Sequence, residues 1–175
     1  MEELYQQMLL DIREAEDELE KELDGVSEES AAVIITPGSW SIADCVVHIT
    51  MIEFSVLGII RQIPDESYSL SPVPFIIGRE KLRELLLDRS RKIKLPDAFE
   101  SRMEKQELQV AYKKLKSVRA MLKERISSGS IVSPEMIRVH PVLGDMTKID
   151  WLFTVAFHSL RHTEQIKGIK VHLGK

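Results

Sequence analysis

The chain has 175 residues, enough for one domain of ordinary size, and 43% of them are hydrophobic, which suffices for a sizeable core. Its 28 acidic and 24 basic residues give a net charge of −4, which argues against general binding to nucleic acid. One cysteine excludes an intrachain disulfide, the N-terminus lacks the basic start of a signal peptide, and no apolar run reaches the roughly 18 residues of a membrane helix. We therefore expect a single cytoplasmic domain over residues 1–175, with no nucleic-acid or membrane partner.

The first two long helices are predicted from apolar residues that recur every three or four positions. One should cover residues 3–23, where a charged face accompanies the apolar stripe. Ser41 with Asp44 resembles a capping box, so the other should cover about residues 40–62. Its core face is expected to include Cys45, Ile49, Ile52, Val56 and Ile59.

The remaining chain predicts a crossover and two more long helices. Residues 64–96 are interrupted by prolines and have a helical pattern only at residues 79–87, so we expect a crossover with one short helix. Long helices should follow over residues 105–126 and from a second capping-box pattern at Thr147 onward. No convincing β alternation is found, and a four-helix bundle is the simplest interpretation. The expected core face of the third long helix is Leu108, Ala111, Tyr112, Leu115, Val118, Met121 and Leu122.

Histidines are the most informative chemical feature of the sequence, and two of them form a pair. His158 and His162 are four residues apart on the last predicted helix, so their side chains project from one face with Cβ atoms about 5–6 Å apart. That spacing lets two imidazoles reach one ion, because zinc–nitrogen bonds are about 2.0–2.1 Å long. Surface histidines also reach this spacing by chance, but Trp151, Val155 and Leu160 give this pair an apolar setting.

A third histidine, His48, lies on the second predicted long helix among Val46, Val47 and Ile49. A single core histidine satisfied by a backbone or carboxylate partner would also explain it. If the helices of His48 and His158 pack side by side, however, His48 completes a three-nitrogen site. Three imidazoles suit one divalent ion, zinc or nickel first and iron or copper as further options, and leave positions open for water or substrate.

Two histidines and the cysteine are expected to lie outside this site. His172 is 14 residues beyond His158, about 21 Å along a helix, so it cannot share the ion. His140 precedes Pro141 in a predicted loop and is expected to be a turn or rim residue. Cys45 is expected to be a small buried side chain.

Asp44 and Gln165 are candidates to orient the metal ligands, but we favour a helix cap for Asp44 and a solvated helix face for Gln165. Glu164 should point away from His162, so no obvious acid or base accompanies the histidines. Ser159 stands where the zincin motif H-E-x-x-H has its glutamate, which disfavours a zincin protease.

Two segments of the chain resemble the DinB-like and YfiT-like proteins. Residues Ser39 to Asp44, leading to His48, resemble the second-helix motif of that family. The other segment resembles its fourth-helix signature and comprises the run 140–147 followed by Trp151, His158, Arg161, His162, Gln165 and Ile166.

This resemblance implies an all-α, up-down-down-up four-helix bundle, often a homodimer. It implies a divalent metal held in a pocket by His48, His158 and His162. The family includes metal-dependent hydrolases and transferases that use low-molecular-weight thiols such as bacillithiol, mycothiol or glutathione, and many of its members have no established activity.

Three kinds of function remain open on the sequence. The first is an enzyme in which a metal activates a small thiol, or water in a hydrolase, for attack on a small-molecule substrate. The second is a module that binds a metal or small ligand without turnover. The third is a protein that works by association through a dimer face, with the histidines as a structural polar cluster.

Overall fold

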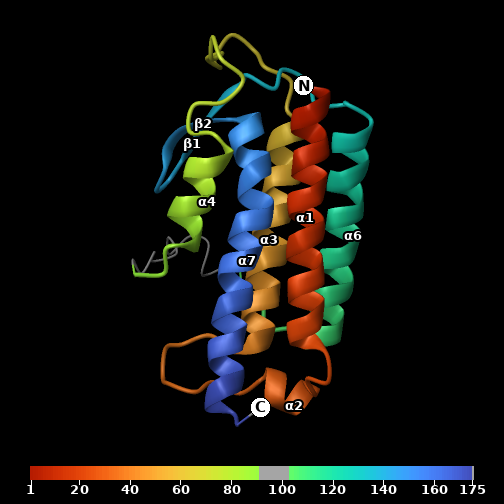
Figure 1. Ribbon diagram of the computed structural model, residues 1–175, viewed down its shortest axis with the longest axis vertical. Helices are drawn as coiled ribbons and strands as arrows, with labels where there is room; N and C mark the ends of the chain where they lie inside the picture. The colour runs from red at the N-terminus through yellow and green to blue at the C-terminus, as the bar shows by residue number, and fades with distance from the viewer. Residues whose placement is uncertain (91–102, 175) are drawn as a thin grey trace.

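The computed structural model describes residues 1–90 and 103–174 of the chain. Within these ranges the protein consists of helices and one antiparallel pair of short strands (Figure 1). The elements are α1 (Glu2–Leu23), α2 (Glu28–Ala31), α3 (Ile42–Arg61), α4 (Arg79–Leu87), α6 (Leu108–Ser127), β1 (Ile137–His140), β2 (Gly144–Thr147) and α7 (Lys148–His172).

Four long helices form the bundle. Figure 1 shows α1 and α7 running in one direction and α3 and α6 in the other, which is the expected up-down-down-up order. In this arrangement α3 packs against both α6 and α7, and α1 packs mainly against α7. The helices that carry His48 and the histidine pair are therefore direct neighbours.

Both predicted capping boxes are present at the helices that matter for the site. At the start of α3 the Ser41 hydroxyl accepts a bond from the Asp44 amide at 3.1 Å, and the Asp44 carboxylate accepts one from the Ser41 amide at 2.9 Å. Thr147 and Asp150 make the same reciprocal pair at the start of α7. Each box satisfies amides that the first helical turn leaves without a backbone partner.

The expected core faces are correct apart from four positions. Ile52 and Ile59 on α3 and Tyr112 on α6 are only half-buried, and Met121 on α6 is 40% exposed. The crossover contains the expected short helix, α4, at the predicted residues. Residues 91–96 of the predicted crossover lie outside the described residues.

Two small elements were not predicted. Ser27 caps the single turn of α2, where its hydroxyl accepts a bond from the Ser30 amide. Strands β1 and β2 pair from Ile137 opposite Thr147 to the bend at Gly144. The expectation of a chain without strands was thus wrong for these eight residues. Each strand has only four residues, mostly exposed or half-buried, so the sequence shows no alternation of apolar and polar residues there.

Polar contacts fasten the crossover to α7. The Asp150 carboxylate accepts bonds from the amides of Ile76 and Gly78, at 2.7 and 2.9 Å, just before α4 begins. At the other end of α4, one guanidinium nitrogen of Arg161 donates to the carbonyl oxygens of Leu86 and Asp88, at 2.9 and 2.7 Å. The short helix α4 is therefore held at both ends against the helix that carries the histidine pair.

Of the described helices, α3 is the one that is long and apolar enough to cross a membrane, judged by length and composition alone. Just over half of its apolar stretch is buried inside the bundle. It also contains Glu53, a fully buried carboxylate. Arg119 from α6 binds Glu53 through two guanidinium nitrogens, at 2.7 and 3.0 Å, and donates to the Ser159 hydroxyl on α7 at 2.6 Å. This buried network joins three of the four long helices.

We expect Arg119→Met to lower the free energy of unfolding by about 3–5 kcal/mol, because it leaves the Glu53 carboxylate buried without its partner. Urea denaturation at neutral pH measures the change. The matched control is Lys123→Met, which removes an ion pair with the partly exposed Glu16 and should cost no more than about 1 kcal/mol. Equal losses in the two variants would contradict this role for the buried pair.

Candidate metal centre

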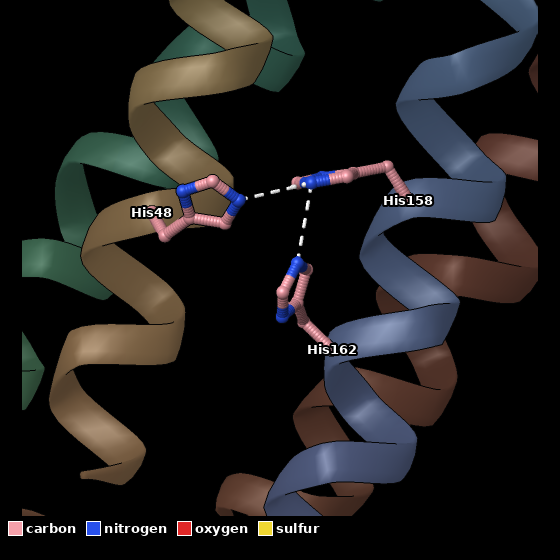
Figure 2. A group of neighbouring side chains, drawn as sticks. All are labelled: His48, His158 and His162. Carbon is pink, nitrogen blue, oxygen red and sulfur yellow. Dashed lines mark hydrogen bonds between the residues drawn. The ribbon is translucent and has the colours of Figure 1, made fainter. Parts of the chain in front are cut away.

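The histidine pair is built into the middle of α7. His158 and His162 follow each other by one helical turn and point away from the helix in the same direction (Figure 2). The His162 side chain is buried, whereas His158 keeps partial solvent contact. The pair is thus set within the core, with His158 in partial contact with solvent.

His48 faces the pair from α3. Its side chain is buried, and Figure 2 shows its ring directed across the space between α3 and α7 toward His158. The sequence-based expectation that the two helices pack side by side and bring the three histidines together is therefore confirmed.

The three Nε2 atoms converge. The distance from His158 Nε2 is 3.0 Å to His48 Nε2 and 3.2 Å to His162 Nε2, and the three ligand atoms all lie within 4.8 Å of one another. Two nitrogens bound to one ion at about 2.0–2.1 Å can be at most about 4.2 Å apart. The two short pairs meet this limit, and the third distance is no more than 4.8 Å.

Hydrogen bonding alone explains this convergence poorly. A neutral imidazole nitrogen carries either one proton or one lone pair, so His158 Nε2 cannot make a separate, well-aligned hydrogen bond to each neighbour. In addition, the Nδ1 atoms of His48 and His158 are buried without a hydrogen-bond partner among the described residues. Three lone pairs directed at one point fit a cation better than they fit one another.

Burial keeps all three imidazoles neutral. It lowers the pKa of His48 to about 3, with a further contribution from His162. It lowers the pKa of His162 to about 4, although the hydrogen bond that His162 donates to Gln165 opposes the shift, and it lowers the pKa of His158 well below its usual value. Neutral imidazole is the form that binds a metal, so no proton would have to leave at neutral pH.

Two side chains hold His162 in place. Gln165 Oε1 lies 3.0 Å from His162 Nδ1, so the amide oxygen accepts the Nδ1 proton and leaves the Nε2 lone pair free. Trp40 stacks on the His162 ring at a centroid distance of 5.6 Å and lies 4.7 Å from the His48 ring. This contact was not predicted from the sequence, although Trp40 directly precedes the Ser41 cap in the segment that resembles the second-helix motif of the DinB-like proteins.

The other residues considered near the histidines have the roles that we favoured, except for Gln165. Asp44 caps α3 as we favoured, but Gln165 binds His162 instead of lying on a solvated face. Cys45 is buried, as expected, and burial raises the pKa of its thiol to about 12. Glu164 points to Lys167, with which it forms an ion pair.

The two remaining histidines lie outside the cluster, as expected. His172 is exposed near the end of α7, where its Nδ1 lies 2.7 Å from the Gly168 carbonyl oxygen. His140 ends β1, and its Nδ1 accepts bonds from the amides of Val142 and Leu143 in the hairpin turn. The turn or rim position predicted for His140 is therefore confirmed.

Fold and site together define a helical-bundle protein with a three-histidine cluster between α3 and α7. The DinB superfamily pattern matches residues 11–166, and the chain belongs to the DinB superfamily.

Individual proteins agree with this assignment. The uncharacterized protein YuaE of Bacillus subtilis (strain 168) is 30% identical over 165 residues, which cover 90% of this chain and 93% of YuaE. Among solved structures, TT2238, described as a four-helix bundle protein, superposes with a TM-score of 0.57 over 93% of this chain and 97% of its own. Its sequence identity is 16%, so this likeness shows the fold alone.

The lowered pKa values predict that the metal-free protein loses stability in mild acid. The histidines of the unfolded chain bind protons below about pH 6.5, whereas His48 and His162 of the folded chain stay neutral down to about pH 3 and 4. The unfolded state then binds more protons, so the free energy of unfolding should fall between pH 6.5 and 4 by up to about 1.4 kcal/mol per pH unit for each histidine.

Urea denaturation of chelator-treated protein between pH 7 and 5 measures this slope. Replacing His162 by Leu should reduce it, and His172→Gln, which removes an exposed imidazole, is the matched control. An unchanged slope in His162→Leu would show that the site is not responsible.

Proposed function

We propose that the protein is a metal-dependent enzyme that binds one divalent ion, zinc or nickel first and iron next, through His48, His158 and His162. The observation that carries this proposal is the convergence of three neutral imidazole nitrogens, two of the three pairs at 3.0–3.2 Å, between α3 and α7. Such an ion would supply Lewis-acid activation of a thiol or of water, which corresponds to a thiol S-transferase or a hydrolase of small molecules.

The residues of the chain would provide orientation and a dry environment. Gln165 fixes the proton of His162 on Nδ1, and Trp40 covers one side of the site by contacting His48 and His162. The partial exposure of His158 leaves an approach for a small ligand. The three-histidine ligand set leaves coordination positions that the protein itself does not fill.

A thiol substrate suits this site because activation by a metal requires no protein base. Among the described residues, the carboxylates closest to the histidines in sequence have other partners: Asp44 caps α3, and Glu164 pairs with Lys167. A low-molecular-weight thiol that loses its proton on metal binding could attack an electrophile directly. A metal-binding or ligand-binding module without turnover is the alternative function.

The protein is further proposed to be cytoplasmic and homodimeric. An apolar groove of about 710 Å³ lies between α3 and α6 and includes Phe54, which is 63% exposed, and Val110, which is 44% exposed. Such a surface could be covered by a second copy of the chain. Sedimentation of the purified protein tests this point.

Elemental analysis of protein purified without an affinity tag tests the metal. We expect close to one divalent ion per chain, lost in His48→Ala and His158→Ala because each removes a ligand and leaves a gap in the site. His172→Ala is the matched control and should retain the metal. No metal after reconstitution with zinc, nickel and iron would leave the histidines as a structural cluster and refute the proposal.

Turnover distinguishes an enzyme from a binding module. The metal-loaded protein should accelerate the reaction of glutathione, cysteine or another small thiol with 1-chloro-2,4-dinitrobenzene or a bimane halide, and ester substrates test the hydrolase. His158→Ala should reduce the rate to that of the uncatalysed reaction, while His172→Ala should keep it. Stoichiometric metal with no turnover across a broad panel of thiols and electrophiles would favour the module.

A further inference from the structure

The β-hairpin presents a fourth histidine, His140, whose ring is held by the hairpin turn. The backbone amides of Val142 and Leu143 each lie 3.1 Å from His140 Nδ1 and donate to it. A backbone amide can only donate, so Nδ1 must be the unprotonated nitrogen of the ring. The remaining nitrogen, Nε2, therefore carries the proton.

This Nε2–H group makes no hydrogen bond within the described residues, and the ring is partly exposed, so the group is open to solvent or to a ligand. Burial lowers the pKa of His140 to about 4, so the ring is neutral at physiological pH. His140 is thus a neutral donor whose orientation is fixed by the two bonds to its Nδ1. A neutral imidazole N–H can bind and polarise an acceptor oxygen without bringing a positive charge next to a metal.

The hairpin carries His140 toward the three-histidine cluster. Its ring packs on Trp151 at a centroid distance of 4.9 Å, and the Trp151 indole in turn donates to the Arg138 carbonyl oxygen of β1 at 3.2 Å. Trp151 and His158 are seven residues apart on α7, so they share one face of the helix about 10 Å apart along its axis.

Two further observations agree with this placement. Figure 1 shows the hairpin beside the N-terminal part of α7, with its turn directed along the helix away from its start. His140 is also close enough to His158 to contribute to the lowering of the His158 pKa. His140 therefore lies on the same side of α7 as the cluster, displaced along the helix by the span of a small molecule.

We propose that His140 is a ligand-binding residue of this site, whose Nε2–H donates to a carbonyl or carboxylate oxygen of a small molecule bound at its other end by the three-histidine cluster. The proposal rests on the proposed function and deepens it by naming the substrate class. The ligand is a thiol, or another metal-binding group, that carries an oxygen acceptor several bonds away. A simple alkyl thiol would reach the cluster without making this second contact.

The proton position can be tested without metal or substrate. Long-range proton–nitrogen NMR of the histidine rings in the metal-free protein should show His140 with its proton on Nε2 and an unprotonated Nδ1. A proton on Nδ1, or rapid exchange between both forms, would overturn the proposal.

The contact itself is tested with two thiols and two variants of the cobalt-loaded protein. N-acetylcysteamine carries an amide oxygen and ethanethiol does not, and the cobalt absorption bands report binding of either. His140→Asn should keep the turn, because an asparagine side-chain oxygen also accepts bonds from amides just ahead of it, but it loses the Nε2 donor. His140→Phe loses both, and His172→Asn is the remote control.

We expect the unmodified protein and His172→Asn to bind N-acetylcysteamine about fivefold to tenfold more tightly than ethanethiol, the size of one hydrogen bond. Both His140 variants should lose this preference, with the affinity for ethanethiol unchanged within about twofold. A preference that survives in both variants, or is missing in the unmodified protein, overturns the role of His140 and leaves the proposed function intact. If neither thiol perturbs the cobalt bands, the thiol-binding function and this inference both fail.

Discussion

Three neutral imidazole nitrogens converge between two neighbouring helices, and this is the costly arrangement that the rest of the structure has to accommodate. Burial of His48 and His162, with the partly exposed His158 between them, costs hydration that the protein recovers only in part. Two buried Nδ1 atoms have no partner in the described part of the chain. A helical bundle gains little stability from such an arrangement, so other contacts must hold the helices together around it.

Those other contacts are polar ones placed around the cluster. The buried network of Arg119, Glu53 and Ser159 ties α6 to α3 and α7, the helices that supply the three histidines. Buried ion pairs add little net stability over apolar packing, but they disfavour alternative registers, because a shifted helix would leave a charge unpaired. The positions of His48 and His158 depend on that register, since a shift of one helical turn moves a side chain by about 5.4 Å.

Much of the fold could be predicted because its signals are local. Apolar periodicity gave the four long helices, and the capping boxes at Ser41 and Thr147 gave the starts of α3 and α7. The histidine pair was predictable from its spacing on one helix, while His48 required the assumption that α3 packs against α7. The contacts of Trp40 and Gln165 could not be derived in this way, because they depend on how the α3 cap and the α7 side chains meet across the core.

The hairpin was not predicted either, because it has no regular sequence period. Several structural roles are combined in this one short segment. Gly144 has a φ of +77°, a conformation that favours glycine, and it follows the turn that holds the His140 ring. Three residues later Thr147 begins the cap of α7, and the Asp150 carboxylate of that cap also binds the crossover before α4. Eleven consecutive residues therefore orient one imidazole, reverse the chain, start the helix that carries the histidine pair and anchor the segment that packs on it. No helix or strand period describes such a segment, because each residue in it is selected by a different constraint.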